Sequence, residues 1–387
     1  YYRELISASD DRQEQATFQM LLTELYYDQQ NFAQAESFAR ELLAIDFEDD
    51  NSAGYYREER AYSIIGNALL QQQKYEAAGE AFAEGLKRYP NSGESGNLNF
   101  SLGFAHVSGG DYEAAVRVFR EFVEAYPDNF NRVHGQYYLA HGLQALTQFK
   151  DAAAAFEELA ERHPRSQYTE EALFLVGENN YNEQDYATAV EAYQRLQAKY
   201  PDGTYSGSAQ YALAWSFVEQ ELMDEAVAAM RTLVARYPRS EFASRAQFTI
   251  GDHYYNAQAY EEAMTAYQHV VDDYPESGEA GRAASLISEL QEIQASFDYN
   301  QAMSLLEGKQ YQEAITGLQA IIEKYPGTYT ELAAYCNLGL AYEILREWQE
   351  AVDNYRVVAE RGGDQPENAD VVRFAQMHSD WIVENRL

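Results

Sequence analysis

Histidine and cysteine are the residues of this chain best suited to metal binding or nucleophilic catalysis, and both types are rare. The 387 residues include seven histidines and one cysteine, Cys336, so no internal disulfide can form. Only His134 and His141 fall on one face of a predicted helix. Their separation of seven residues puts them roughly 10 Å apart along a helix axis, too far to share one small ion. We therefore expect no metal site.

The acidic residues are abundant, but their arrangement does not indicate catalysis. Adjacent carboxylates, such as Glu157 with Glu158 and Glu170 with Glu171, are typical of a solvated helix face. The sequence contains no phosphate-binding loop, no Gly-x-Ser-x-Gly elbow and no His-Glu-x-x-His motif. We therefore expect a protein that is not an enzyme and uses no cofactor. An enzymatic role would require a separate domain upstream of Tyr1.

The net charge of −35, from 63 acidic and 28 basic residues, restricts the class of partner. Such a surface repels a phosphate backbone, so we expect no nucleic acid binding and favour a basic protein or peptide. No segment approaches the ~18 consecutive apolar residues of a membrane-spanning helix. The chain begins at Tyr1 rather than methionine, which is consistent with removal of a signal peptide or an earlier domain.

A dipeptide that ends in proline divides the chain at regular intervals. Tyr-Pro or His-Pro recurs every 37 residues from Tyr89-Pro90 to Tyr274-Pro275, and once more at Tyr325-Pro326. A fixed period of this size is typical of stacked repeats that bury a common core. Proline ends one helix, and the serine or threonine that follows in most links is predicted to cap the next. The sequence therefore predicts a single solenoid over residues 1–387.

The second helix of each predicted repeat has a constant pattern. It begins with a large residue, which is aromatic in most repeats, and has an alanine three residues later. Except in the first repeat, another large side chain follows seven residues after the opening residue. These spacings place the three side chains on one helical face. A glycine or alanine nine residues before the opening residue, also lacking in the first repeat, would let the preceding helix approach closely. The nine predicted starts are Phe32, Tyr75, Tyr112, Phe149, Tyr186, Met223, Tyr260, Tyr311 and Trp348.

This order of small residue, aromatic residue, alanine, large residue and proline resembles the tetratricopeptide repeat, a helix-turn-helix unit of about 34 residues. The long form marked by Tyr-Pro resembles repeats of bacterial envelope proteins, such as the lipoprotein BamD and the periplasmic coordinator associated with the Tol-Pal system. The resemblance implies an all-α, right-handed α-solenoid of about nine repeats. It also implies a location in the bacterial periplasm, at the outer membrane or outside the cell.

Aromatic residues recur at the fifth position of the first helix, which in this family lines a concave groove that binds peptides or helices. Offsets of four and seven keep further residues on the same side, with Glu171, Glu178 and Asp252 nearby in the sequence. Simple helix-helix contact would favour the same residues, so both interpretations stay open. The predicted partner-binding residues are Phe100, Phe104, Tyr137, His141, Phe174, Tyr181, Tyr211, Trp215, Phe248, Tyr255 and Tyr299.

Two insertions interrupt the period. The spacing from Phe32 to Tyr75 is 43 residues, and residues 46–51 are predicted to form an acidic loop. The spacing from Tyr260 to Tyr311 is 51 residues, so residues 277–307 are predicted to form an extended or extra helix. Its apolar stripe needs a cover, which is either an adjacent repeat or another molecule. The stripe comprises Leu286, Ile287, Leu290, Ile293 and Phe297.

Residues 366–387 are predicted to form a C-terminal capping helix, because a proline suits its first turn and apolar residues follow along one side. The sequence as a whole predicts a protein-binding scaffold of the bacterial cell envelope that holds a partner segment in the groove. The alternative is a structural subunit that self-assembles into an oligomer or a filament.

Overall fold

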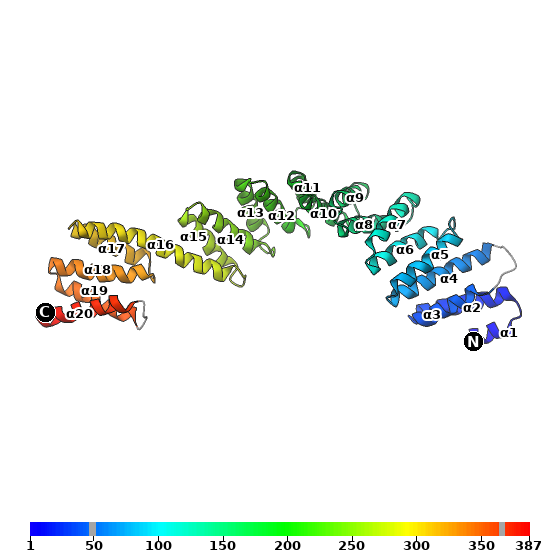
Figure 1. Cartoon of the computed structure of the whole chain (residues 1–387), viewed down its shortest axis with the longest axis horizontal. Coiled ribbons are helices and arrows are strands. Elements are labelled where there is room, and N and C mark those ends of the chain that lie inside the picture. The colour runs from blue at the N-terminus through cyan, green and yellow to red at the C-terminus, as the bar shows by residue number, and fades with distance from the viewer. Residues whose placement is uncertain (46–51, 364–367) are drawn as a thin grey trace. The chain divides into compact units, whose positions relative to one another are not determined.

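The computed structural model describes residues 1–45, 52–363 and 368–387, and the side chains of residues 52–56 are not described. Within these residues the chain forms twenty helices and no strand (Figure 1). It divides into two compact units, Tyr1–Ala229 and Met230–Leu387. The predicted acidic loop at 46–51 and the proline at 366 lie outside the described residues. The all-α solenoid class predicted from the sequence is confirmed, and each unit is a stack of helical hairpins.

In the first unit, each helix from α1 to α11 contacts the next helix along the chain. The unit contains α1 (Tyr2–Ala8), α2 (Arg12–Asp28), α3 (Phe32–Leu43), α4 (Ser52–Gln71), α5 (Tyr75–Arg88), α6 (Ser95–Gly109), α7 (Tyr112–Ala125), α8 (Arg132–Ala145), α9 (Phe149–Arg162), α10 (Thr169–Asn182), α11 (Tyr186–Lys199), α12 (Ser206–Glu219) and the start of α13 (Met223–Arg236).

The second unit is built in the same way, and its last helix covers the end of the stack. It contains the end of α13, α14 (Ala243–Asn256), α15 (Tyr260–Asp273), α16 (Ala280–Glu307), α17 (Tyr311–Lys324), α18 (Tyr329–Leu345), α19 (Trp348–Gly362) and α20 (Ala369–Asn385). Ala375 and Ile382 of α20 are fully buried in a cluster with Tyr355 and Val358 of α19. The helix α20 thus packs on α19, within the range 366–387 for which a capping helix is predicted.

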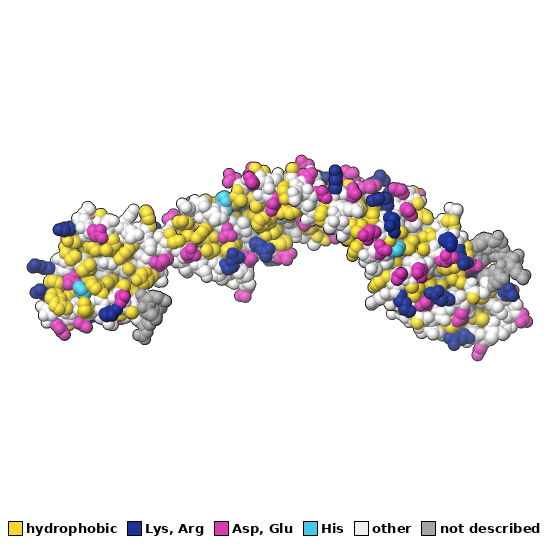
Figure 2. Space-filling model, in the orientation of Figure 1, with side chains coloured by type: hydrophobic (Ala, Val, Ile, Leu, Met, Phe, Trp, Pro, Cys, Tyr) yellow, Lys and Arg dark blue, Asp and Glu magenta, His cyan; other side chains and the backbone are white. Residues whose placement is uncertain are grey.

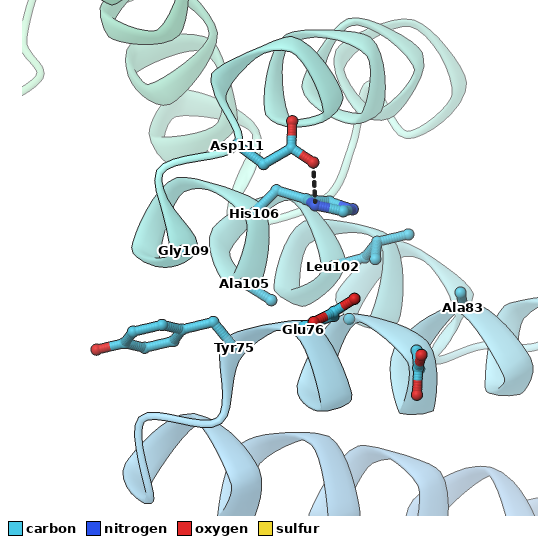
Figure 3. A pocket seen from close by; sticks show the side chains of 10 residues that line it. Tyr75, Glu76, Ala83, Leu102, Ala105, His106, Gly109 and Asp111 are labelled. Atoms are coloured by element: carbon cyan, nitrogen blue, oxygen red, sulfur yellow. Dashed lines mark ion pairs between the residues drawn. The ribbon is translucent and has the colours of Figure 1, made fainter.

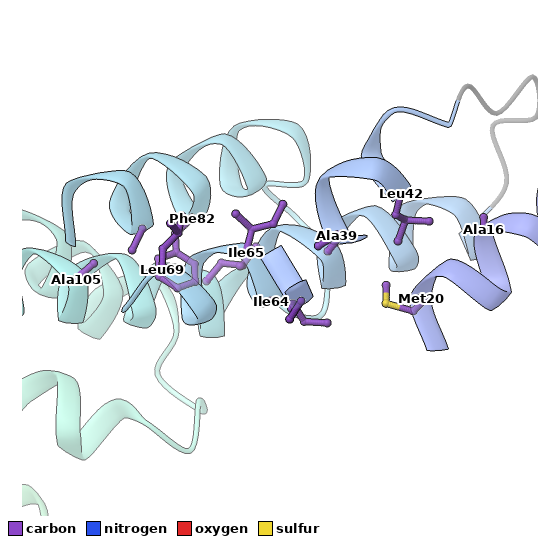
Figure 4. Close-up of a cluster of buried hydrophobic side chains, with 13 residues drawn as sticks. Ala16, Met20, Ala39, Leu42, Ile64, Ile65, Leu69, Phe82 and Ala105 are labelled. Carbon is purple, nitrogen blue, oxygen red and sulfur yellow. The ribbon is translucent and has the colours of Figure 1, made fainter. Parts of the chain in front are cut away.

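The alanine three residues after the start of each second helix sets the distance between neighbouring helices. All nine of these alanines have 0% exposure, from Ala35 in α3 to Ala351 in α19. Figure 4 shows the cluster in the first unit to which the first two belong, where Ile65, Leu69 and Phe82 lie among small side chains. Because a larger residue at such a position would overpack the core, the constant alanine has a steric cause.

Where the small residue of the first helix is a glycine, it lies against a large ring of the second helix. A Cβ atom added to Gly177 would lie 2.3 Å from Cε1 of Tyr193, and one added to Gly251 would lie 2.4 Å from Cε1 of Tyr267. Both distances are shorter than any normal carbon contact. The close approach predicted from the small residues therefore occurs, and the space is filled by an aromatic ring.

The turn inside every hairpin has the same left-handed residue two positions before the second helix. It is Gly110 in one repeat (φ 79°), whereas eight other repeats place a larger residue there with φ between 56° and 65°. The N–H that follows it bonds back into the first helix, as from Asp185 to the Asn180 carbonyl at 2.9 Å. This ending satisfies carbonyls of the last helical turn. The eight residues are Gln30, Gln73, Thr147, Gln184, Glu221, Gln258, Lys309 and Arg346.

The prediction that link hydroxyls cap the following helices is wrong for most repeats. The residues that precede α6, α10, α12 and α14 make no side-chain cap bond. Ser166 Oγ instead accepts a hydrogen bond from Tyr168 N–H at 3.2 Å inside the link, because the link makes a turn of its own before α10 begins. Thr328 is a true cap, since its Oγ1 accepts from Glu331 N–H of α18 at 3.0 Å.

The 14 extra residues are part of one continuous helix, α16, which belongs to two core clusters. Leu286, Ile287 and Leu290 pack into a cluster with α14 and α15, and Leu290 has 0% exposure. Further along, Ala302 is buried with residues of α17 and α18. Of the predicted stripe, Leu290 is therefore covered by its own chain, and Leu286 and Ile287 are partly covered. The other two, Ile293 and Phe297, are 39% and 67% exposed.

Candidate partner-binding surface

The eleven predicted groove residues, which we call the aromatic face, are nearly all partly accessible. Ten are half-buried, and Phe248 is buried with 4% exposure. Phe248 lies against the Tyr267 ring at 5.3 Å, with the Arg282 guanidinium 4.6 Å from its centroid. Phe100 contacts Phe119 of α7 at 5.7 Å. These two rings mainly join helices, as the packing interpretation expects.

Two rings of the aromatic face stack on tyrosines that the sequence analysis did not select. Tyr137 stacks on Tyr168 with centroids 4.3 Å apart and planes inclined by 26°. Phe174 stacks on Tyr205 at 5.2 Å and 25°. Tyr168 and Tyr205 are 37 residues apart and each directly precedes a first helix. This spacing was the available signal, and it extends the aromatic face from one repeat to the next within the first unit.

Carboxylates bridge consecutive repeats along the aromatic face. The Tyr137 hydroxyl donates to Glu171 Oε1 at 3.1 Å, and the Tyr181 hydroxyl donates to Glu219 Oε1 at 3.4 Å. In the second unit, Tyr255 donates to Glu289 Oε1 at 3.3 Å. Each bond joins a phenol of one first helix to a carboxylate of the next. The surface thus combines flat apolar rings with negative charge.

Two carboxylates predicted beside the groove are directed into their own repeats. Glu178 accepts a hydrogen bond from the Tyr193 hydroxyl at 2.5 Å, and Asp252 accepts one from Tyr267 at 2.7 Å. Burial raises the pKa of Glu178 above its ordinary value, while the bond from Tyr193 lowers it. These two acids therefore hold the core tyrosines in place, and Glu171 is the predicted acid that lies with the aromatic face.

His141 lies at the centre of this surface in the first unit. Its ring is 4.3 Å from the Tyr137 ring and 5.0 Å from Phe156, and its Nε2 is 4.0 Å from Glu171 Oε1. Burial lowers the pKa of His141, which the Glu171 carboxylate opposes. A neutral imidazole beside a phenol and a carboxylate can bind a polar group of a partner but offers no activated nucleophile.

The remaining residues of the aromatic face make edge contacts or polar contacts. Trp215 meets Tyr211 edge-on at 6.1 Å, and Phe104 meets Tyr138 at 5.6 Å. Tyr299 accepts a hydrogen bond from Asn337 Nδ2 at 2.6 Å. The structure thus places residues of the aromatic face on the first helices of both units, at the repeat positions that the sequence predicts.

An acidic cavity of about 700 Å³ lies between α5 and α6 (Figure 3). Glu76 and Glu80 of α5 face it, and His106 Nδ1 lies 3.5 Å from Asp111 Oδ2 at its edge. The hollow exists because small residues such as Gly79 line it on the α5 side. A cavity with three carboxylates suits a cationic side chain better than an anionic one.

The environment of the single cysteine does not favour a reactive thiolate. Cys336 is 8% exposed, and burial raises the pKa of its thiol to about 11, so it remains a neutral core residue. Among residues 1–45, 52–363 and 368–387, no cluster of three histidine, cysteine or acidic residues could hold a metal ion. None of the helices in this part of the chain is long and apolar enough to cross a membrane. Acidic side chains are spread over the visible face of both units (Figure 2).

Stacked helical hairpins, an alanine-spaced core and an aromatic face on the first helices define a scaffold of the tetratricopeptide-repeat class. The sequence matches the model of the YfiO family, described as an outer membrane lipoprotein, over residues 56–176, 146–252 and 169–356. These overlapping matches span more than half of the chain, which therefore belongs to this family of tetratricopeptide-repeat proteins. A comparison with curated proteins found no match.

The solved structures to which this chain is similar are distant in sequence. The C-terminal part of a TPR repeat-containing protein from Cytophaga hutchinsonii is 12% identical, with a TM-score of 0.50 over 68% of this chain and 98% of that one. MamA from Desulfovibrio magneticus RS-1 is 19% identical, with a TM-score of 0.38 over 47% of this chain and 97% of that one. YrrB, described as a TPR protein with an unusual peptide-binding site, is 18% identical, with a TM-score of 0.40 over 54% and 97%.

Proposed function

We propose that this chain is a non-enzymatic protein-binding scaffold of the bacterial cell envelope, which holds a basic segment of a partner along the aromatic face. The observation that carries the proposal is the alternation of half-buried rings and carboxylates on successive first helices, as in Tyr137, Tyr168 and Glu171. Flat rings provide contact area at a low cost in conformational entropy, and carboxylates select cationic side chains. The net charge of −35 adds electrostatic attraction for a basic partner.

Two adjacent tyrosines provide a matched pair for testing this surface. Tyr255 belongs to the aromatic face, whereas Tyr254 lines a separate cavity of about 460 Å³ with residues of α15. Peptides selected from a random phage library against the purified chain would be measured by fluorescence anisotropy. We expect Tyr255→Ala or Tyr137→Ala to weaken the binding of selected basic peptides roughly tenfold, as truncation of an aromatic anchor does. Tyr254→Ala should change it by less than about twofold.

The test compares how much peptide affinity is lost in the two tyrosine variants. Equal losses for Tyr254→Ala and Tyr255→Ala would contradict the assignment of the aromatic face, provided that circular dichroism shows unchanged helix content. A selection that yields only acidic peptides would contradict the basic partner. The envelope location is supported by the description of the family, and it is tested separately by immunoblotting of fractionated cells with antibodies against this chain. Recovery in the cytoplasmic fraction alone would contradict it.

A second candidate function, self-assembly through α16, is favoured by one observation. Ile293 and Phe297 lie one helical turn apart in the middle of α16 and remain exposed, whereas the rest of the stripe is buried or partly buried. Light scattering of the wild-type chain and of Phe297→Glu at low and high salt tests this function. A concentration-dependent oligomer that is lost in Phe297→Glu would support it, and a monomer under all conditions would exclude it.

A further inference from the structure

One cavity of this strongly acidic chain has a basic lining. It has a volume of about 560 Å³ and lies in the first unit, where the start of α8, the end of α9 and the link before α10 meet. Its lining includes Arg162, Arg165, His134 and His163, and none of the residues that line it is acidic. The cavity between α5 and α6 and the cavity that Tyr254 lines, both described above, carry two or more carboxylates each. This local reversal of charge is not a consequence of composition.

The basic side chains at this cavity differ in whether a neighbouring residue already pairs with them. Arg162 Nε lies 2.8 Å from Glu158 Oε1, so its charge is partly balanced by a neighbour on the same helix. Arg165 is exposed and forms no ion pair or side-chain hydrogen bond with the described residues. His134 Nδ1 and His163 Nε2 are buried ring nitrogens without a hydrogen-bond partner in the described part of the chain. Three nitrogen-bearing side chains at one cavity therefore retain unused hydrogen-bonding capacity.

Four further residues of the lining are apolar, and one of them is highly exposed. Phe130 is 77% exposed, although it is a large ring in a link that precedes α8. Val133, Pro164 and Tyr168 complete the apolar part of the lining. A volume of this size exceeds what a single small anion fills and lies in the range of sites that hold several side chains. The cavity thus suits a chain that brings an apolar side chain together with a carboxylate.

The links of other repeats show that this combination of residues is specific to this place, since the arginine recurs at Arg239 but without the histidine. The position of His163 is tyrosine in the other links of the 37-residue series, and the position of Arg165 is aspartate at Asp128 and Asp202. The equivalent of Phe130, two repeats later, is Thr204. A repeat architecture that needs only a proline-containing link therefore does not require a basic and aromatic lining.

We propose that this cavity binds an acidic segment of a protein partner, with a carboxylate between Arg165 and the two histidines and an apolar side chain against Phe130. Opposite charge supplies the selectivity, because a carboxylate accepts hydrogen bonds that guanidinium and imidazole donate. The cavity adjoins the aromatic face, because Tyr168 lines it and also stacks on Tyr137, but the two surfaces select peptide segments of opposite charge. A partner segment with separate basic and acidic parts could occupy both.

The test uses residues that other repeats already carry, so that each variant keeps a sequence compatible with the fold. The probe is a fluorescein-labelled peptide of four glutamates around one leucine, and its binding to the full chain is measured by anisotropy at low salt. We expect Arg165→Asp to weaken binding about tenfold or more, since it removes a charge-assisted contact and adds repulsion. Phe130→Thr and His163→Tyr should each weaken it roughly three- to tenfold.

The matched control is Arg239→Asp, which makes the same charge change at the equivalent position two repeats later, where Tyr237 replaces the histidine. Binding that is within about twofold of wild type in this variant would show that the effect of Arg165→Asp is local. Equal weakening by both variants would overturn the proposal, because it would reduce the effect to net charge. Displacement of the peptide by inorganic phosphate, with no effect of Phe130→Thr, would also overturn it and leave a simple oxyanion site. The proposal would also be overturned if a peptide with lysines in place of the glutamates bound this cavity as tightly as the glutamate peptide.

Discussion

Replacing Gly251 by alanine tests the central steric feature of the fold. Gly251 lies in the interior of α14, and an added Cβ would be 2.4, 2.5 and 3.0 Å from three ring atoms of Tyr267. Tyr267 is 1% exposed and its hydroxyl is held by Asp252, so the ring has little freedom to move away. The control is Gly281→Ala in α16 of the same unit, where an added Cβ meets nothing within 4 Å.

The expected magnitude follows from two opposing contributions. Overpacking a core by one methyl group costs about 1–3 kcal/mol, and contact with three ring atoms places this case in the upper half of that range. Alanine in a helix interior recovers about 1 kcal/mol relative to glycine. The net loss of unfolding free energy should therefore be about 1–2 kcal/mol, or roughly 3–6 °C in Tm for a unit of this size. Gly281→Ala should leave Tm unchanged or raise it slightly.

Thermal unfolding followed by circular dichroism measures both variants in the full chain. A Tm for Gly251→Ala at or above that of wild type would refute the steric reasoning. A double variant sharpens the test, because another repeat of this unit combines Ala302 with Leu318 at the same two positions. Adding Tyr267→Leu to Gly251→Ala should recover about 1 kcal/mol relative to the sum of the single effects. Strict additivity would show that the two residues do not compete for space.

Three further predictions concern the turns, the core acids and the basic cavity. Thr147→Gly should stabilise the chain by about 0.5–1 kcal/mol in urea unfolding, because Thr147 is a β-branched residue at φ 56°; Gly110→Ala should have the opposite effect. Tyr193→Phe should cost roughly 1–2 kcal/mol at neutral pH. Because burial already raises the pKa of Glu178, this loss should shrink as the pH falls and the folded state takes up the proton; an equal loss in urea titrations at neutral and acidic pH would contradict this reasoning. Burial and two nearby arginines lower the pKa of His163, so affinity for the acidic peptide should rise as the pH falls below about 6.5, and His163→Tyr should reduce this rise.

The sequence predicts much of this fold because the same close packing of two helices recurs in each repeat. The alanine of each second helix and the glycine opposite its large ring are both visible as a period of 37 residues. The long helix α16 is also predictable, since few residues between Glu279 and Glu307 disfavour a helix. The left-handed turn residues are not, because glutamine, threonine and arginine give no signal for positive φ.

The candidate sites are harder to predict, because repeat position alone does not separate surface from core. Phe100 and Phe248 occupy the same repeat position as Tyr137, yet their rings mainly fill space between helices. Tyr168 stacks on the aromatic face from a link, where no helical pattern would select it. The basic cavity depends on three segments that meet only after folding, so the arginine at 165 appears in the sequence as an ordinary surface residue.

The continuous helix α16 has a consequence for how the second unit comes apart. A stack of hairpins joined by flexible links can fray from either end, one repeat at a time, because each boundary has its own turn. α16 has no turn at the boundary between the α14–α15 hairpin and the α17–α18 pair, and it supplies buried residues to both clusters. Opening either side therefore exposes one end of a helix that the other side still holds. Fraying that starts at α20 should stall at α16, which makes this helix the natural limit of partial unfolding in the unit.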